Sequence, residues 1–165
     1  MYLEADGRLE HAQECNSGLS MIPAMVQVEL EDIAVSGDEN QFLVLLRSLD
    51  GDILPIRIDA MQAISIVAGR SSERMERPLT HDLMVSVLEM LGASLARVEI
   101  TDLVEGTYYA MLIMERSEVS FEVDARPSDA LALAVRTKAP IFVARHVLEQ
   151  SGMRDEFDGS GGAQA

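Results

Sequence analysis

The chain has 165 residues, 48% of them hydrophobic, which suits a single domain with a buried core. Its 28 acidic and 13 basic residues give a net charge of -15, which counts against tight nonspecific nucleic-acid binding because such binding needs a positive field. A local basic patch, or a metal ion that offsets the acids, is compatible with this balance.

Neither a membrane span nor a signal peptide is expected from the sequence. No apolar run reaches the roughly 18 residues that a membrane span needs. The N-terminal stretch is acidic and has no apolar core, which does not fit a signal peptide. A single cysteine, Cys15, cannot form an internal disulfide. These features predict a cytoplasmic protein.

Both ends of the chain differ in composition from its centre. Residues 1–20 are polar and aperiodic, and they predict a flexible N-terminal tail. Residues 153–165 are polar and Gly-rich, and they predict a flexible C-terminal tail. One domain is therefore expected over residues 21–152.

In the first half of that domain, alternating or continuous apolar residues predict three strands, over residues 26–31, 42–46 and 53–58. Ile33 falls out of phase with the first strand, which indicates a bulge. A turn is expected at residues 36–40, and Asp50-Gly51 is typical of a hairpin. A helix follows over residues 60–68 and is expected to end at Gly69.

The second half begins with a charged loop and a helix in which Thr80 is the expected N-cap and Gly92 the end. One face of this helix is apolar; it is formed by Leu83, Met84, Val87, Leu88 and Leu91. Three strands follow, over residues 95–103, 107–114 and 119–124. A helix over residues 130–135, capped by Ser128, is apolar all round and should be buried. A short strand and a last helical segment are predicted over residues 140–143 and 145–150.

The two halves resemble each other. Residues 28–33 (VELEDI) match residues 98–103 (VEITDL), and the break in the strand phase recurs at the same place. Each copy continues with two further strands and a helix, over residues 25–69 and 95–138. The predicted fold class is therefore α+β: a mixed β-sheet built from a duplicated three-strand-plus-helix unit, with helices packed on it.

The copies differ in the polar residues that join the last strand to the helix. Residues 59–62 of the first copy read DAMQ, whereas residues 126–129 of the second read RPSD. Because a shared backbone path does not require the second set, Arg126 and Asp129 are candidates for binding or catalysis. The alternative is that Arg126 forms a structural ion pair with Asp124 or Asp129 at the start of a buried helix.

A second polar cluster, RPLTHD at residues 77–82, also opens a helix after Arg-Pro. Thr80 and Asp82 are ordinary helix-start residues, since carboxylates favour the positive end of a helix. His81 has no capping role and is a candidate general base or phosphate donor. The remaining histidines, His11 and His146, lack such neighbours in the sequence and are interpreted as surface residues.

Four motifs, in order along the chain, resemble the bifunctional nuclease (BFN) domain family: RPLTHDL at 77–83, EGTYYA at 105–110, ARPSDA at 125–130 and APIFV at 139–143. The resemblance runs from about Met25 to Gly152. It implies an α+β fold with a mixed sheet, a tendency to dimerise, and nuclease activity on both DNA and RNA.

Phosphodiester hydrolysis needs an activated water, stabilisation of the charged phosphorane and a proton for the leaving oxygen. We therefore assign catalytic roles to one histidine and three acids: His81, Asp82, Asp124 and Asp129. Substrate binding is assigned to Arg77, Arg126 and Ser128, because arginine can hold phosphate through two hydrogen bonds. A divalent metal such as Mg²⁺, if used, would be held by Asp124 and Asp129. These residues belong to two helix starts, which we expect to face one cleft.

The sequence thus predicts a homodimeric nuclease that hydrolyses DNA and RNA. An alternative of a different class is a non-enzymatic dimeric binding or regulatory module, in which residues 126–129 recognise an anion or a protein partner. The acidic composition and the lack of a firm metal-binding motif favour this alternative.

Overall fold

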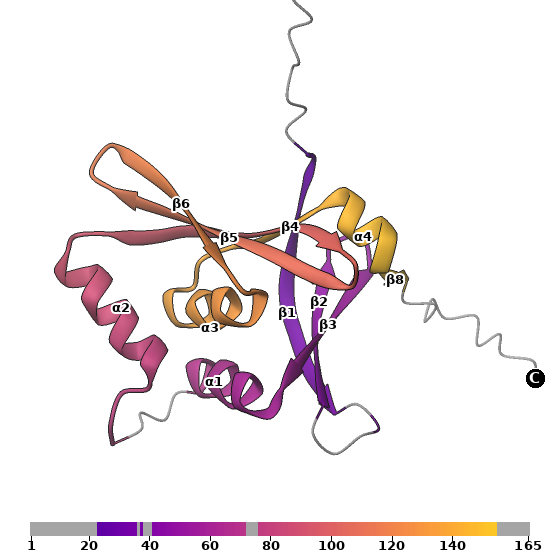
Figure 1. The fold of residues 1–165 in the computed structure, drawn as a ribbon, viewed down its shortest axis with the longest axis horizontal. Helices are drawn as coiled ribbons and strands as arrows, with labels where there is room; N and C mark the ends of the chain where they lie inside the picture. Colours follow the sequence, from indigo (N-terminus) through magenta and orange to yellow (C-terminus); the bar gives the residue numbers. More distant parts are fainter. Residues whose placement is uncertain (1–22, 36, 38–40, 72–75, 155–165) are drawn as a thin grey trace, which may run out of the picture.

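A computed structural model describes residues 23–35, 37, 41–71 and 76–154 (Figure 1). The described strands form one eight-stranded sheet in the order β6-β5-β4-β7-β1-β2-β3-β8. Their bounds are β1 Met25–Val35, β2 Gln41–Ser48, β3 Asp52–Asp59, β4 Ser94–Val104, β5 Thr107–Arg116, β6 Val119–Ala125, β7 Ile141–Ala144 and β8 Met153–Arg154. The helices are α1 Ala60–Arg70, α2 Thr80–Met90, α3 Pro127–Thr137 and α4 Arg145–Ser151.

The sheet is mixed. Strand β4 pairs with β7 in parallel, whereas the other pairs, including β1 with β7, are antiparallel. The expected α+β class with a mixed sheet is therefore confirmed. Each half of the chain contributes a three-stranded antiparallel meander followed by a helix, β1-β2-β3-α1 and β4-β5-β6-α3. The origin of the two halves in a duplication stays a prediction.

Both expected bulges are present. The pairing register shifts between Leu30 and Asp32 in β1, and between Ile100 and Asp102 in β4. In each bulge the aspartate accepts a hydrogen bond from the backbone N–H of the next residue, at 2.7 Å for Asp32 and 2.8 Å for Asp102. Because a bulge leaves an amide without its ladder partner, the carboxylate supplies one locally.

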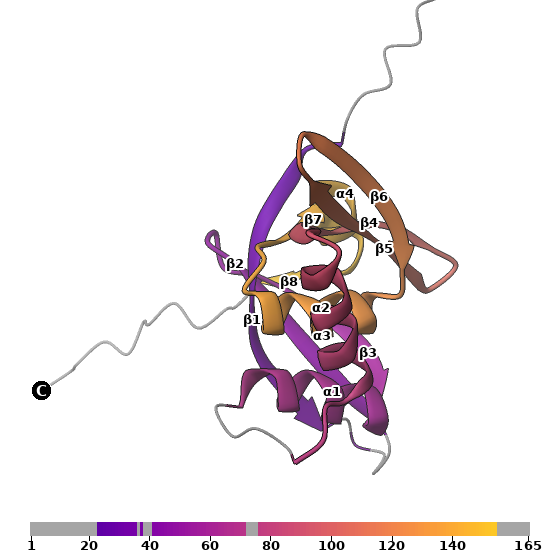
Figure 2. The same cartoon turned by 90° about the vertical axis from the view of Figure 1, so that its left-hand side faces the viewer.

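Helix α3 forms the centre of the core. In Figures 1 and 2 it lies against the sheet with α1 beside it, and α2 runs along their outer side. Residues 130–134 of α3 are all buried, as the uniformly apolar sequence predicts. Among the described residues, no helix is long and apolar enough to cross a membrane.

Helix α1 was expected to end at Gly69, but it continues to Arg70, with Ser71 as its C-cap. The glycine serves helix packing instead. A Cβ built at position 69 would lie 2.7 Å from Cγ2 of Val135 and 2.6 Å from Nη1 of Arg136, both on α3. Only a glycine lets the two helices approach this closely.

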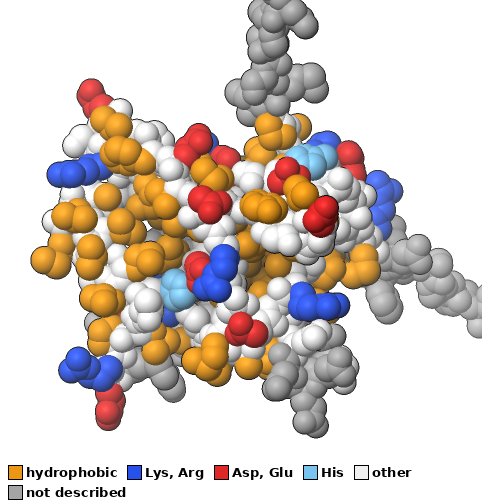
Figure 3. All heavy atoms as spheres, in the orientation of Figure 1, with side chains coloured by type: hydrophobic (Ala, Val, Ile, Leu, Met, Phe, Trp, Pro, Cys, Tyr) orange, Lys and Arg blue, Asp and Glu red, His pale blue; other side chains and the backbone are white. Residues whose placement is uncertain are grey.

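Two further expectations, both at helix starts, need correction. Thr80 and Ser128 are the first and second residues of their helices, and the N-caps are Leu79 and Arg126. The apolar face of α2 is only partly covered: Leu88 packs against the core, but Leu83, Met84, Val87 and Leu91 are 42–58% exposed, and α2 lies on the side of Figure 3 where hydrophobic side chains gather. A periodic apolar pattern cannot by itself distinguish a core face from a face that another molecule covers.

Several expectations fall outside the described residues. These are the tail at residues 1–20 and most of the turn at residues 36–40. Of the expected C-terminal tail, Met153 and Arg154 are described, and they form β8 on the edge of β3.

We expect Gly69→Ala to destabilise the protein. Alanine gains up to about 1 kcal/mol of helix propensity over glycine, but overpacking against α3 costs about 1–3 kcal/mol. The free energy of unfolding should fall by about 1 kcal/mol, measured by urea denaturation with an unchanged slope. An increase in the urea midpoint would show that α1 and α3 can move apart without cost.

Candidate active site

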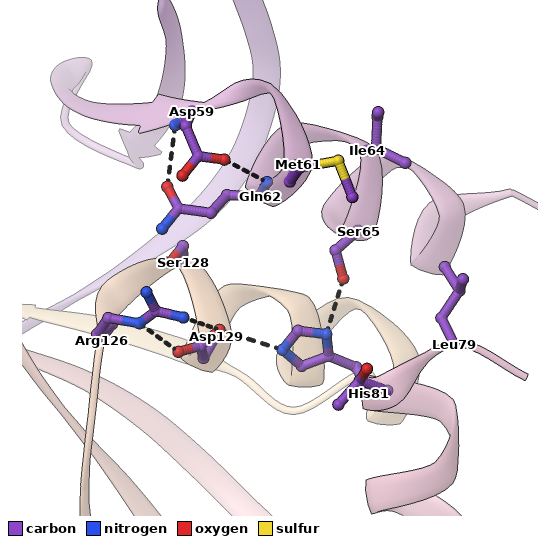
Figure 4. Close-up of a pocket in the computed structure, with 11 residues that line it drawn as sticks. Asp59, Met61, Gln62, Ile64, Ser65, Leu79, His81, Arg126, Ser128 and Asp129 are labelled. Atoms are coloured by element: carbon purple, nitrogen blue, oxygen red, sulfur yellow. Dashed lines mark hydrogen bonds and ion pairs between the residues drawn. The ribbon is translucent and has the colours of Figure 1, made fainter.

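The starts of α2 and α3 meet, as the sequence predicts. Nε2 of His81 on α2 lies 3.3 Å from Oδ1 of Asp129 on α3. On the other side of the imidazole ring, Nδ1 of His81 lies 2.7 Å from Oγ of Ser65 on α1 (Figure 4). Three helices therefore contribute one residue each to a chain of contacts from Ser65 through His81 to Asp129.

The local sequence explains the position of His81. Oδ2 of Asp82 accepts a hydrogen bond of 2.8 Å from the backbone N–H of Leu79, which fixes the first turn of α2. This turn directs the His81 side chain toward α1 and α3, where it is only 14% exposed. With contacts at both nitrogens, the ring has a defined orientation.

Arg126 and Asp129 form a bidentate pair across the first turn of α3. Nε of Arg126 donates to Oδ2 at 2.7 Å and Nη2 donates to Oδ1 at 3.2 Å. Pro127 occupies the first helical position and ends the pairing of β6, so the arginine at the strand end faces the carboxylate three residues later. The hydrogen bond and charge of Asp129 raise the pKa of Arg126, which is therefore fully cationic.

A cavity of about 310 Å³ lies over these residues; we call it the His81 cavity. It is lined by Asp59, Met61, Gln62, Ile64, Ser65, Leu79, Thr80, His81, Arg126, Ser128 and Asp129. Ser128 is only 5% exposed, and within the described part of the chain its hydroxyl has no hydrogen-bond partner. Two helix starts and the first turns of α1 thus surround one hollow on the surface.

Four of the seven residues that sequence analysis selected line this cavity: His81, Arg126, Ser128 and Asp129. The other three, Arg77, Asp82 and Asp124, are not among its lining residues. Asp82 points instead to α3, where its Oδ1 accepts a hydrogen bond of 2.6 Å from Nε of Arg136. Its two bonds, to Leu79 and Arg136, give it a structural role at the start of α2.

Asp124 is exposed on β6. Strand alternation places it on the opposite side from Ala125, which packs against the core, and therefore away from Asp129. Arg77 is exposed before α2 begins and lies outside the cavity wall. The expected gathering of all seven residues is thus incomplete.

The acids of the site do not fit the expected metal centre. Among the described residues, no group of three or more His, Cys, Asp or Glu side chains is placed to hold a metal ion. Asp129 uses both carboxylate oxygens for Arg126 and His81, and Asp124 is not among the lining residues of the cavity. A divalent ion normally requires several oxygen ligands, so the pair Asp124 and Asp129 does not form such a site.

Sequence analysis missed four residues that shape the site. Asp59 and Gln62 form a capping box at the start of α1, with bonds of 2.9 Å in each direction, and both line the cavity. Their DxxQ spacing was a usable signal. Ser65 and Arg136 lie within helices, and neither carried a sequence signal.

His146 also has a neighbour that the sequence did not reveal. Its Nε2 lies 3.2 Å from Oδ1 of Asp102 on the outer surface, away from the cavity. The backbone N–H of Leu103, together with His146, lowers the pKa of Asp102. The described residues therefore include two His–Asp contacts of similar length, of which the one at His81 lies in the cavity.

Comparison with known proteins identifies the family to which the chain belongs. The sequence profile of the bifunctional nuclease domain matches residues 44–156 of the chain. The chain belongs to the bifunctional nuclease domain family. It is 43% identical over 137 residues to an uncharacterised protein of Mycobacterium tuberculosis, covering 81% of this chain and 82% of that protein.

Plant members of the bifunctional nuclease domain family are also similar. The chain is 32% identical over 118 residues to bifunctional nuclease 1 of Arabidopsis thaliana, and 29% identical over 116 residues to bifunctional nuclease 1 of Oryza sativa subsp. japonica. Both matches cover 67% of this chain, but only 36% and 35% of the respective plant proteins.

Asp82→Asn should reduce stability in a pH-dependent way. Burial acts to raise the pKa of Asp82, but the bonds from Arg136 and Leu79 outweigh it, and the pKa falls below its ordinary value of 3.8. Its stabilisation is therefore complete above the ordinary value and is lost as pH falls through the lower native one. At neutral pH the variant should lose about 2 kcal/mol of unfolding free energy, because Arg136 keeps its buried charge without a counter-ion.

Urea denaturation from neutral to strongly acidic pH measures this effect. The difference between parent and Asp82→Asn should shrink as the pH falls below 3.8. Asp124→Asn is the matched control, since its carboxylate has no partner among the described residues. A difference that is constant with pH would exclude an ionic role for Asp82.

Proposed function

We propose that this protein is a nuclease that hydrolyses phosphodiester bonds in DNA and RNA, and that the His81 cavity is its active site. The contact between His81 and Asp129, with the Arg126 cation at the same cavity, is the observation that carries the proposal. Membership of the bifunctional nuclease domain family and the names of the plant relatives support it.

The proposed reaction uses five residues. Arg126 uses Nε and Nη2 to bind Asp129, which leaves Nη1 to hold a phosphate oxygen, and the Ser128 hydroxyl donates to a second oxygen. Asp129 accepts a hydrogen bond from Nε2–H of His81, so Nδ1 is the base: it takes the Ser65 hydroxyl proton while that hydroxyl takes a proton from the attacking water, and Asp129 stabilises the resulting imidazolium. Water in the cavity protonates the departing oxygen.

Ser65 relays the proton in this scheme. The Asp129 carboxylate holds the hydrogen of neutral His81 on Nε2, so Nδ1 carries the lone pair, and Oγ of Ser65 is placed to donate to it at 2.7 Å. Asp129 thereby selects the tautomer that can act as a base, and the hydroxyl connects Nδ1 to the attacking water.

His81→Ala and Asp129→Asn should each lower the rate of plasmid and RNA cleavage about 10²- to 10⁴-fold, the usual contribution of a general base and its partner. His146→Ala, which removes the equivalent contact on the outer surface, is the matched control and should retain parental activity. Each assay is run with EDTA and with added Mg²⁺. Full activity in both cavity variants would assign the cleavage to another site or to a contaminant.

We also propose that the protein is a homodimer and that α2 and β6 form its interface. Eight side chains of these two elements and the C-cap of α2 are large, apolar and exposed: Leu83, Met84, Val87, Met90, Leu91, Val119, Phe121 and Val123. Figure 3 has hydrophobic side chains gathered on the side that carries these elements. Their exposed area is on the order of 800 Å², about what one partner buries in a standard interface. Strand β6 is also an unpaired sheet edge.

Val87→Asp should convert the dimer to a monomer, since it places a charge in the centre of the apolar face. Analytical ultracentrifugation across a concentration series measures the association. Leu49→Asp, which charges an exposed apolar residue of the β2–β3 turn, should leave the association unchanged. A monomeric parent protein, or a dimer that Val87→Asp does not weaken, would contradict this interface.

The alternative function is a non-enzymatic module that binds an anion. It is favoured by the pairing of Arg126 with Asp129, which leaves a binding cation in the cavity without requiring any chemistry. The same assays separate the two functions, because the module predicts saturable anion binding and no cleavage. A cytoplasmic location is part of either proposal and rests on the single cysteine.

A further inference from the structure

A second cavity adjoins the His81 cavity. It measures about 290 Å³ and lies between β3, the β4–β5 turn and the start of α3; we call it the Arg57 cavity. Its lining consists of Ile56, Arg57, Ile58, Gln62, Gly106, Thr107, Tyr108, Arg126, Pro127 and Ser128. Gln62, Arg126 and Ser128 line both cavities, so the two hollows share one wall.

Arg57 is the unusual residue of this cavity. Its side chain is exposed, and within the described part of the chain its guanidinium has no hydrogen-bond or ion-pair partner. Among the other strand arginines, Arg47 is paired with Glu31 and Arg97 with Glu99, whereas Arg116, at the exposed end of β5, has no partner among the described residues and lies outside both cavities. In a chain with a net charge of -15, an arginine without a carboxylate partner beside a cavity indicates an anionic ligand.

The shared wall provides further donors. Oε1 of Gln62 accepts a backbone bond, and among the described residues its amide nitrogen has no acceptor (Figure 4). The Ser128 hydroxyl and Nη1 of Arg126 also have no acceptor among the described residues. No Asp or Glu is among the lining residues of the Arg57 cavity. Arg57 is a cation without a carboxylate partner, and together with these unused donors it provides the chemistry that binds phosphate.

Tyr108 gives the cavity an aromatic surface. Its hydroxyl donates a hydrogen bond of 3.3 Å to the backbone carbonyl of Pro55 on β3, which holds the ring against the strand. The ring and the neighbouring Ile56 and Ile58 form an apolar part of the lining. An aromatic face beside a cation is the arrangement on which bases of a single strand stack.

We propose that the Arg57 cavity binds the nucleotide adjacent to the reacting phosphodiester on a single-stranded nucleic acid. Arg57 holds its phosphate and Tyr108 stacks on its base. The spacing is suitable: Arg57 precedes Asp59, a residue of the first cavity, by two strand positions or about 7 Å, close to the separation of neighbouring phosphates. The assignment to a reaction rests on the proposed function, whereas the binding of a strand does not.

Fluorescence anisotropy with a short labelled oligothymidylate, in EDTA, tests the binding. Arg57→Ala should raise the Kd about tenfold, the effect of losing one charge-assisted hydrogen bond. For this variant, the slope of log Kd against log salt concentration should also fall by about 0.7, the value for one lost phosphate contact on a single strand. Arg57→Lys should give an intermediate Kd. Arg145→Ala, an exposed arginine outside both cavities, is the matched control and should match the parent.

Cleavage kinetics separate the second cavity from the first. Bis(p-nitrophenyl) phosphate carries no adjacent nucleotide, so Arg57→Ala should leave its kcat/KM unchanged while oligonucleotide cleavage falls about tenfold. The proposal is overturned if the Kd values of Arg57→Ala and Arg145→Ala agree, or if both substrates lose activity equally. A parent that binds the oligonucleotide through Arg57 but cleaves neither substrate would refute the nuclease function and leave the subsite standing.

Discussion

The arrangement of the cavity depends on one buried guanidinium. Arg136 is only 6% exposed, and it joins three helices: Nε donates to Asp82 on α2, and Nη1 donates to the backbone carbonyls of Ser65 on α1 and Ala132 on α3. A buried charge is costly unless its hydrogen bonds are made, so these contacts fix the three helices relative to one another. The three residues of the contact chain, Ser65, His81 and Asp129, come from the same three helices.

A local property of helices explains why the site is built on helix starts. The first turn of a helix leaves backbone N–H groups to be satisfied, and short polar side chains gather there. In α1 Asp59 and Gln62 each accept one N–H, in α2 Asp82 accepts one from Leu79, and in α3 Pro127 removes one donor. These residues are used within their own first turns, whereas His81 and Arg126 line the cavity. Capping and proposed chemistry are therefore divided between neighbouring residues.

Sequence patterns predict the features of the fold and site that depend on neighbouring residues, but not those that depend on tertiary contacts. Strand alternation, the bulges just before Ile33 and Leu103, and the meeting of His81 with Asp129 were accessible, because local periodicity and unexplained polar residues indicate them. Ser65 was not, since a serine within a helix has no pattern that distinguishes it. Asp82 and Asp124 were selected by residue type alone, and their orientation depends on contacts that only the tertiary structure defines.

The position of β7 has a consequence for how the sheet is completed. This four-residue strand lies between β1 and β4 and is the strand through which the two three-stranded meanders are hydrogen-bonded. Because β7 is encoded after both meanders, a growing polypeptide carries two separate half-sheets with open edges until residues 141–144 leave the ribosome. Closure of the sheet is then a late event in biosynthesis, and the exposed edges of β1 and β4 must avoid other strands until it occurs.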